Sequence, residues 1–400
     1  MSTSIPVLEL NTTSFGSTSW REVGKKKRNI PRQQRLDIQR KNTDFYNFVD
    51  KTLQSLSKKR LHVKKFTLTD SLDKGKSVSR IDRWISFVIE SDVEELSLNF
   101  DQGWYCRKYQ LPQCVLVAKS IIALTLCQCK LESSCGDINL SSLKKLSLCD
   151  IIGDDRIIQK LVVGSPLIED MRFTNCTLES TSGGDMNLPA LKTLSLCKVH
   201  VDDQIIQKIV AGSPVIEDMR FTSCHGLKSI KFEGLTKAMS IELTYNGDLE
   251  RDMVIPQQLR ETLPSPSYNV KQLKLETGNL VIGLDIVELM DSLLWIAPLP
   301  EILLIALSID MEPWMDTICF KFSYEKPILK GKKPSCCKFL PIPCWRHCLK
   351  SVMIENFRVL GDEETLKAKE ASLEKYFKEN AEILETFQFL RSDISALKDL

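Results

Sequence analysis

The sequence predicts an α/β solenoid, in which strand–turn–helix units stack as a horseshoe with a parallel sheet on the concave face and helices outside. The first observation is an internal repeat: residues 140–176 and 188–224 are identical at 25 of 37 positions. The second is a leucine pattern that recurs within each copy every 23 to 25 residues. The third is the alternation of strand-like and helix-like apolar spacing. Units that cannot bury their own apolar faces are expected to stack into an array.

The recurring pattern is that of leucine-rich repeats, L-x-x-L-x-L-x-x-N/C-x-L. Within the duplicated region it begins at Leu143, Ile168, Leu191 and Ile216, and a complete upstream match begins at Ile121. Partial matches begin at Val63, Val93, Val270 and Leu349. The sequence therefore predicts a strand at each of these places.

Each L-x-L core alternates with period two, which predicts a strand with one buried face. Leu146, Leu148, Met171 and Phe173 are expected to point into the core. The intervening side chains are expected to line the concave face, where a repeat array presents its binding surface. The candidate binding residues are Lys145, Asp170, Arg172, Thr174, Asp218, Arg220 and Thr222. Two interpretations of the alternating charges stay open: recognition of a protein partner, or neutralisation between neighbouring strands.

A helix is expected after the strand that opens each copy. The pairs Asp154-Asp155 and Asp202-Asp203 precede apolar runs with helical spacing, and aspartate suits the positive end of a helix. Capping explains these pairs better than acid–base catalysis does. Gly164-Ser165-Pro166 is expected to end the first helix, because glycine accepts a left-handed cap and proline cannot continue a helix.

Four segments are expected along the chain. Residues 1–43 are polar and basic and are predicted to be disordered, 44–310 form the repeat array, 311–345 are a proline-containing irregular insertion, and 346–400 form a strand–helix–strand cap. The remaining expected elements are helices at 44–57 (with Asp44 as a possible N-cap), 77–90, 284–296 and about 363–382, and strands at 349–354 and about 384–390.

The composition limits the classes of partner and the cellular compartments that we expect for this chain. A net charge of +2 gives no case for nucleic acid, and there is no apolar run of 18 or more residues that would predict a membrane span. The N-terminus lacks the pattern of a signal peptide, so the 14 cysteines are expected to be reduced, intracellular and mostly buried. We expect a nuclear or cytoplasmic protein. The basic run Lys25–Arg28 is either a nuclear-import signal or a solvated linker.

The sequence contains no catalytic signature. None of the four histidines lies in a recognisable nucleophile motif, and no phosphate-binding loop is present. We therefore expect no enzyme activity, no catalytic residue and no cofactor.

The sharpest candidate for a metal site is the group Cys336, Cys337, Cys344, His347 and Cys348, which are zinc ligand types. Their spacing does not form a paired C-x-x-C knuckle. The sequence therefore favours buried cysteines with a structural or exposed histidine, and no metal is predicted; zinc is the alternative.

Other cysteines follow the repeat. Cys129, Cys176 and Cys224 occupy the N/C position of the pattern, and Cys149 and Cys197 follow the L-x-L of their strands. Because free cysteine behaves as a small apolar residue, packing inside the turn is favoured over a redox role.

Three ordered motifs carry a family resemblance. The first is DFYNFVDKTLQ, followed by HVKKFTL and RIDRWISFVIESDVEELSL; the second is LKKLSLCDI with the following GSPLIEDMRFTNC. The third is PIPCWRHCLKSVMIENF, followed by LEKYFKENAEILETFQF. Over about residues 44–390 the chain resembles the plant F-box proteins with leucine-rich repeats and a C-terminal FBD-type domain.

The resemblance implies a non-catalytic recognition module, the substrate-binding part of an SCF-type (cullin-RING) E3 ubiquitin ligase. It implies a protein substrate and a Skp-type adaptor as partners, and an FBD-like identity for residues 346–400. Residues 1–43 lack the leucine- and proline-patterned F-box, which is expected to be absent or a remnant. The alternatives are a repeat-only binding protein uncoupled from the ligase, and a small-molecule receptor with a ligand in the arc.

Overall fold

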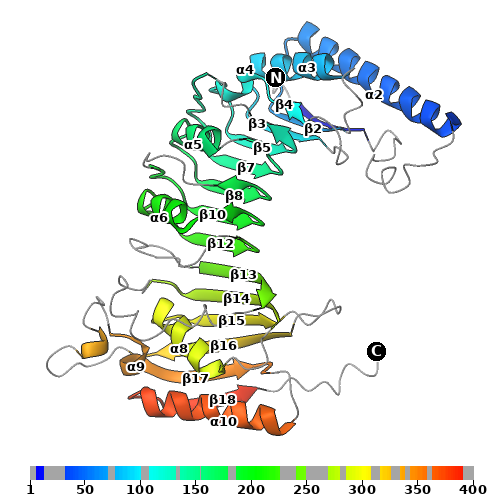
Figure 1. The fold of residues 1–400 in the computed structure, drawn as a ribbon. Helices are drawn as coiled ribbons and strands as arrows, with labels where there is room; N and C mark the ends of the chain where they lie inside the picture. Colours follow the sequence, from blue (N-terminus) through cyan, green and yellow to red (C-terminus); the bar gives the residue numbers. More distant parts are fainter. Residues whose placement is uncertain are drawn as a thin grey trace. The chain divides into compact units, whose positions relative to one another are not determined.

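The computed structural model divides into two compact units, Met1–Leu191 and Lys192–Leu400. The residues it describes are 6–12, 32–70, 77–100, 108–131, 136–153, 155–178, 186–225, 240–248, 269–279, 285–307, 316–325, 334–337, 343–357 and 363–390. Both units are α/β, with mostly parallel strands and with helices in the connections (Figure 1). An α/β fold with a large, mostly parallel sheet was expected, and it is confirmed.

In the first unit the sheet strands follow chain order and every neighbouring pair is parallel. These strands are β1 (Val7–Asn11), β2 (Lys65–Asp70), β3 (Glu95–Phe100), β5 (Ala123–Cys127), β7 (Lys145–Cys149) and β8 (Asp170–Thr174). The helices are α2 (Arg32–Lys58), α3 (Val78–Glu90), α4 (Gln113–Leu116) and α5 (Asp155–Val163), with short strands β4 (Tyr109–Gln110), β6 (Cys129–Lys130) and β9 (Thr177–Leu178).

In the second unit one strand breaks the parallel order. The strands are β10 (Thr193–Cys197), β12 (Asp218–Thr222), β13 (Ser240–Asp248), β14 (Gln272–Asn279), β15 (Ile302–Leu307), β16 (Asp316–Tyr324), β17 (Leu349–Glu355) and β18 (Thr386–Leu390), with the short β11 (His200–Val201). The helical elements are α6 (Asp203–Ala211), α8 (Ile286–Ile296), η3 (Ser335–Cys337), α9 (Trp345–Cys348) and α10 (Glu363–Asn380). β16 is antiparallel to both β15 and β17, whereas β10–β12, β12–β13, β13–β14, β14–β15 and β17–β18 pair in parallel.

The alternation of the repeat strands decides which face is buried. Leu146, Leu148, Met171 and Phe173 are at most 1% exposed. The register places Leu146 beside Met171 and Leu148 beside Phe173, so apolar side chains of successive repeats form continuous rows. Since one face of each strand is covered in this way, the expected inward set is confirmed.

The helix that opens after β10 has the expected cap. The Asp202 carboxylate Oδ1 accepts a hydrogen bond from the N–H of Ile205 at 2.8 Å, at the start of α6. Asp154, its counterpart in the first copy, lies outside the described residues. At the end of α5 a left-handed cap was expected at Gly164, but this was wrong, because the φ of Gly164 lies outside the left-handed region. Its counterpart in the second copy, Gly212, has a φ of −81°.

Glycine is required at position 164 because the backbone of the preceding loop packs directly against it, and not because the chain makes a left-handed turn there. Its carbonyl accepts a hydrogen bond from the N–H of Leu140, and a Cβ at this position would lie 2.5 Å from the carbonyl oxygen of Ile138. Any larger residue would therefore push the end of α5 away from the preceding loop.

Several strands end in a left-handed corner made without glycine. The φ angle is between 51° and 58° at Gln128, Asp150, Asn175, Lys198, Ser223 and Asn356, each directly after a strand. The next residue turns inward, as the cysteines show. The Cys176 thiol donates to the carbonyls of Thr174 and Leu148, and Cys224 repeats both bonds 48 residues later. Packing of these cysteines inside the turn is thus confirmed.

Two parts of segment 1–43 are ordered, where disorder was expected. β1 alternates and pairs with β2, and α2 begins at Arg32, so Asp44 lies inside the helix and does not cap it. Thr43 Oγ1 donates to the carbonyl of Gln39, four residues back in the same helix. Arginine, glutamine and lysine are good helix formers, so a polar composition did not separate an exposed helix from disorder. The basic run Lys25–Arg28 lies outside the described residues.

The irregular insertion expected at 311–345 contains a strand. β16 carries Ile318, Phe320 and Phe322 on one face, and these side chains are at most 6% exposed. The proline count of the segment obscured this period-two pattern. None of the described helices is long and apolar enough to span a membrane.

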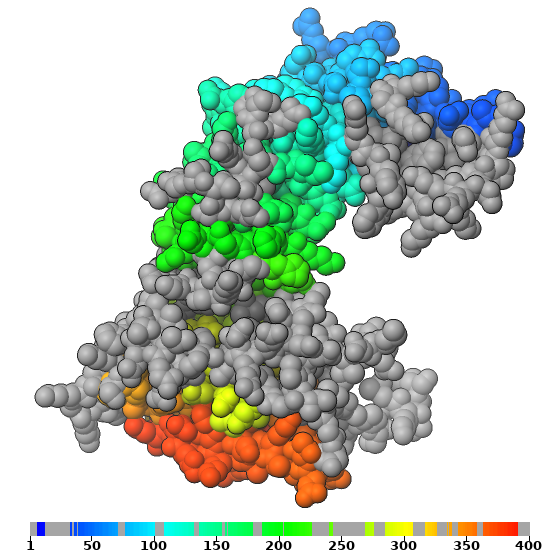
Figure 2. Space-filling view, viewed as in Figure 1, coloured from blue at the N-terminus to red at the C-terminus, as the bar shows by residue number. Residues whose placement is uncertain are grey.

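The end of the second unit is held by an aromatic core. Phe377 of α10 packs against Phe322, Phe387 and Trp345, with ring centroids 5.7 to 6.1 Å apart. Asp291 of α8 accepts hydrogen bonds from the Tyr376 hydroxyl and from Arg346. These contacts hold α9 against both α8 and α10, and α10 contributes to the orange and red surface in Figure 2.

Candidate functional site

The exposed face of β7 and β8 carries the first set of expected binding residues. Lys145 and Arg172 are exposed, whereas Asp170 and Thr174 are partly buried. Arg172 Nε and Nη2 donate to the two carboxylate oxygens of Asp170 at 3.1 and 2.8 Å. This charge pair forms within one strand, between residues i and i+2, and not between neighbouring strands.

On the equivalent face of the second unit, charged side chains pair both within a strand and between neighbouring strands. Arg220 approaches Asp218 of its own strand at 3.4 Å and Glu242 of β13 at 3.7 Å. Glu242 in turn accepts a hydrogen bond from Lys274 of β14 at 2.6 Å. Since the register aligns Arg220, Glu242 and Lys274, they form a row of alternating charge across three strands. Thr222 occupies the next position of the same face, beside Thr244.

Glu242 lies on β13, a strand that the repeat pattern did not predict. The sequence SIELT at 240–244 alternates like the repeat strands, and it places Glu242 at the position that Arg220 occupies in β12. The period-two alternation of a strand is therefore visible in this sequence, but the leucine that opens the repeat pattern is missing from it.

These ion pairs contribute little to stability. The side chains of Arg172 and Arg220 are 60% and 52% exposed. Exposed pairs of this kind are typically worth about 0–1 kcal/mol, because water and salt screen them. A partner could therefore replace these contacts at a small cost, which is what a recognition surface requires.

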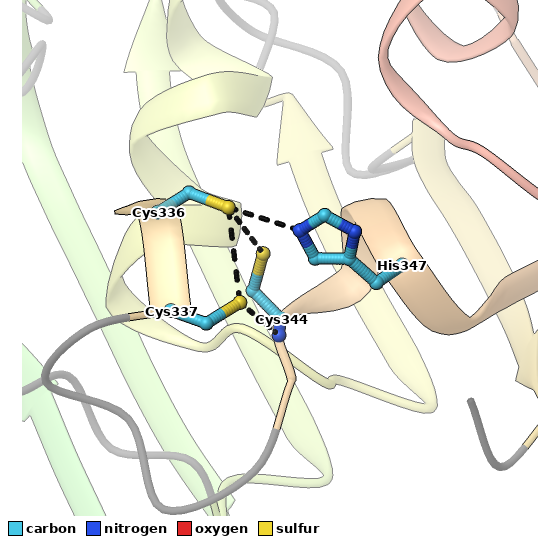
Figure 3. A group of neighbouring side chains, drawn as sticks. All are labelled: Cys336, Cys337, Cys344 and His347. Atoms are coloured by element: carbon cyan, nitrogen blue, oxygen red, sulfur yellow. Dashed lines mark hydrogen bonds between the residues drawn. The ribbon is translucent and has the colours of Figure 1, made fainter. Parts of the chain in front are cut away.

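A second constellation lies in the second unit, where four metal-ligand atoms converge (Figure 3). Cys336, Cys337, Cys344 and His347 each offer one ligand atom, and these atoms all lie within 4.8 Å of one another. Cys336 Sγ lies 3.0 Å from His347 Nε2, 3.7 Å from Cys337 Sγ and 3.9 Å from Cys344 Sγ. Cys348, the fifth residue of the sequence candidate, is separate: its thiol donates to the carbonyl of Cys344.

Local structure explains why adjacent residues converge. The turn η3 presents the thiols of Cys336 and Cys337 to the start of α9, and Cys344 is the N-cap of that helix. His347 follows three residues later, on the same side of the helix turn. Burial raises the pKa values of the Cys336 and Cys344 thiols above their ordinary range. The spacing of these residues in the sequence argued against a metal site. It does not show that two turns of the chain bring the side chains together.

A smaller cluster lies in the first unit. Cys127, Cys149 and Asp150 bring three ligand atoms within the same 4.8 Å limit at the ends of β5 and β7. All three residues are partly buried, and Cys127 and Cys149 are register partners. Among the described residues no fourth ligand joins this cluster, and the register of β5 and β7 accounts for the closeness of its two cysteines.

Comparison with known proteins agrees with the repeat assignment. A family model described as At1g61320/AtMIF1, LRR domain, matches residues 53–177. In Arabidopsis thaliana, the F-box/FBD/LRR-repeat protein At1g13570 is 29% identical over 89 residues, which cover 22% of this chain and 20% of that protein. The putative F-box protein At1g49610 is 29% identical over 176 residues (43% and 40%), and the F-box protein At5g03100 is 31% identical over 130 residues (32% and 39%).

This chain thus matches well under two thirds of the length of each relative. No solved structure matches it significantly. The resemblance to plant F-box proteins with leucine-rich repeats is confirmed.

Proposed function

From this similarity to plant F-box proteins, we propose that the chain is a non-catalytic protein-recognition module of an SCF-type (cullin-RING) ubiquitin ligase. The observation that carries the proposal is the repeated polar ladder on the exposed sheet face. Asp170, Arg172 and Thr174 recur as Asp218, Arg220 and Thr222 with the same in-strand pairing of arginine and aspartate. Each copy of the ladder, one in either unit, is a surface on which a protein substrate would bind.

The chemistry of the ladder suits a protein partner. Arginine offers several donors in a planar fork and is enriched at the energetic centres of protein interfaces. In both repeats the guanidinium is paired with an aspartate of its own strand, which restricts the side chain before binding and lowers the entropy lost on binding. Acidic and hydroxyl groups of a substrate would complement the arginine and threonine positions.

A charge reversal with a matched control tests the surface. Arg172→Glu changes the ladder, and Lys160→Glu makes the same charge change at an exposed position of α5 in the same repeat. Proximity labelling in plant cells should show proteins that are lost from Arg172→Glu and kept by Lys160→Glu. Equal partner sets for parent, Arg172→Glu and Lys160→Glu would remove the ladder from the proposal.

Coupling to the ligase is tested separately. The chain is mixed with a Skp-type adaptor, with an F-box-containing relative as the positive control. Binding supports the ligase assignment. If the folded chain does not bind while the control does, the repeat-only binding function replaces it, and the ladder remains testable by the labelling experiment.

The finer assignments belong to the same proposal. We propose that residues 44–310 form the repeat array with its exposed face concave, that 346–400 form an FBD-like cap, and that the protein resides in the nucleus or cytoplasm. Small-angle scattering tests the curvature, and a fluorescent fusion tests the location. A scattering profile of a compact sphere would contradict the arc.

A further inference from the structure

The cysteine–histidine cluster at α9 has the composition and geometry of a metal site. We propose that Cys336, Cys337, Cys344 and His347 bind one zinc ion, which fastens residues 334–337 to α9. The site is independent of the recognition ladder, because its residues lie on η3 and α9 and contribute nothing to the exposed face of the repeat strands.

The sulfur separations match a tetrahedral ion. Zinc–sulfur bonds of about 2.3 Å at tetrahedral angles place two sulfurs about 3.8 Å apart. The observed Sγ–Sγ distances from Cys336 are 3.7 Å to Cys337 and 3.9 Å to Cys344. A disulfide would need about 2.05 Å. The arrangement is therefore that of thiols spaced around a common centre, and not of a bonded pair.

The histidine completes the set with a small movement. A zinc-bound nitrogen would lie about 3.6 Å from each sulfur. His347 Nε2 is 3.0 Å from Cys336 Sγ, so the imidazole would move outward by roughly half an ångström to admit the ion. Nε2 already faces the sulfurs, as Figure 3 shows, and no change of rotamer is needed.

The other ring nitrogen of the histidine faces a carboxylate. His347 Nδ1 lies 2.9 Å from Glu382 Oε1, although this approach is not aligned as a hydrogen bond. The Glu382 backbone N–H donates to the carbonyl of Arg346 at 2.8 Å, which keeps Glu382 beside α9. A carboxylate behind a metal-bound histidine fixes its tautomer and raises its basicity, and this pairing is common in zinc proteins.

The ligand set determines the kind of ion and the role of the site. Three thiolates and an imidazole favour zinc over the hard ions magnesium and calcium. Four protein ligands leave no open position for a substrate, so the site is structural. Cys337, Cys344 and His347 are buried, whereas Cys336 is exposed and gives the ion a path of entry.

Metal content of the purified 400-residue chain is the direct test. The protein is prepared with a phosphine reductant, loaded with zinc chloride, dialysed and analysed by elemental mass spectrometry. We expect one zinc per chain in the parent. Cys336→Ser removes the exposed ligand and should weaken zinc binding at least tenfold with little effect on folding. Cys348→Ser is the matched control, because Cys348 is a neighbouring buried thiol outside the cluster.

Two further readouts separate this site from adventitious binding. Cobalt(II) in place of zinc should give the intense visible spectrum of a tetrahedral thiolate site in the parent and in Cys348→Ser, and lose it in Cys336→Ser. Glu382→Gln alters only the group behind the histidine and should weaken zinc binding by roughly 10- to 100-fold.

Three outcomes would overturn the proposal. The first is a folded parent that retains no zinc after dialysis. The second is equal zinc retention by the parent and Cys336→Ser, which would place the metal elsewhere, for example at Cys127 and Cys149. The third is a mass deficit of two hydrogens in the protein purified without reductant together with no zinc uptake after reduction, which would identify a disulfide pair in place of a metal site.

Discussion

Leu148 lies on the buried face of β7, and replacing it tests whether the first unit is held together by stacking between repeats. Its side chain is fully buried. The register places it between Leu126 of β5 and Phe173 of β8, which are also buried. A smaller side chain would therefore leave a cavity between three consecutive repeats.

The expected cost follows from that burial. Leucine-to-alanine changes at fully buried sites cost about 2–5 kcal/mol, from lost transfer energy and from the cavity. Leu148→Ala should fall in this range. Leu148→Asp should cost more, because it buries an unpaired charge, and neighbouring repeats should unfold with it since each supplies the core of the next.

The assay has to report on each unit, because the chain consists of two compact units and need not unfold in one step. Urea unfolding gives the free energy, and hydrogen exchange with mass spectrometry locates the loss. We expect protection to fall at β5, β7 and β8. Ser147→Ala, on the opposite face of the same strand, should change stability by no more than about 0.5 kcal/mol. Leu196→Ala repeats the perturbation 48 residues later and should cost a similar amount in the second unit.

The reasoning would be refuted if Leu148→Asp unfolds at the same urea concentration as the parent, or if Ser147→Ala is the more harmful change. Either result would mean that the assigned buried face of β7 is wrong. A loss of protection confined to β7 itself would contradict the stacking argument while leaving the orientation intact.

The remaining predictions concern a helix cap, a closely packed glycine, an exposed ion pair and a buried thiol. Asp202→Ala should cost about 1 kcal/mol in urea unfolding, because it removes the capping bond of α6; no change would show that water replaces the cap. Gly164→Ala should lower the melting temperature, because the new Cβ would lie 2.5 Å from a carbonyl oxygen; an unchanged melt would show that the loop yields freely. Arg220→Ala should cost at most about 1 kcal/mol and less at high salt, and a larger loss would mean that its pairing with Glu242 is structural. Burial raises the pKa of Cys129 from 9.0 to about 12, so its contribution to stability is complete below pH 9 and is lost as the pH rises towards 12. Cys129→Ala should therefore flatten this part of the alkaline stability profile, and an identical slope would contradict the assignment.

Local periodicity was sufficient to predict most of the fold. The strands around Leu146 and Met171 follow from alternation, and α8 and α10 follow from apolar spacing, so their bounds agree with the expected ones to within a few residues. Polar segments gave less information. The start of α2 has good helix formers but few apolar residues to mark its face, and β16 lies among prolines that suggest irregular structure.

The ladder could be predicted from the sequence more completely than the cysteine–histidine cluster could. Positions such as Arg172 and Arg220 are predictable, because a period of two assigns every residue of a strand to one face. The row with Glu242 and Lys274 depends on which strands are neighbours, which a single repeat does not show. Convergence at His347 depends on two short turns, and residue spacing alone does not encode their geometry.

The left-handed corners after the strands affect the unfolded chain as well as the folded one. A residue such as Gln128 or Lys198 with positive φ carries a strain of about 1 kcal/mol or more that glycine would avoid. Glycine, however, would give the denatured chain more conformations to lose on folding, at a cost of about 0.4–1 kcal/mol. The two effects nearly cancel, so the corner positions are close to thermodynamically neutral. Glycine at Gln128 or Lys198 would consequently leave the free energy of unfolding nearly unchanged.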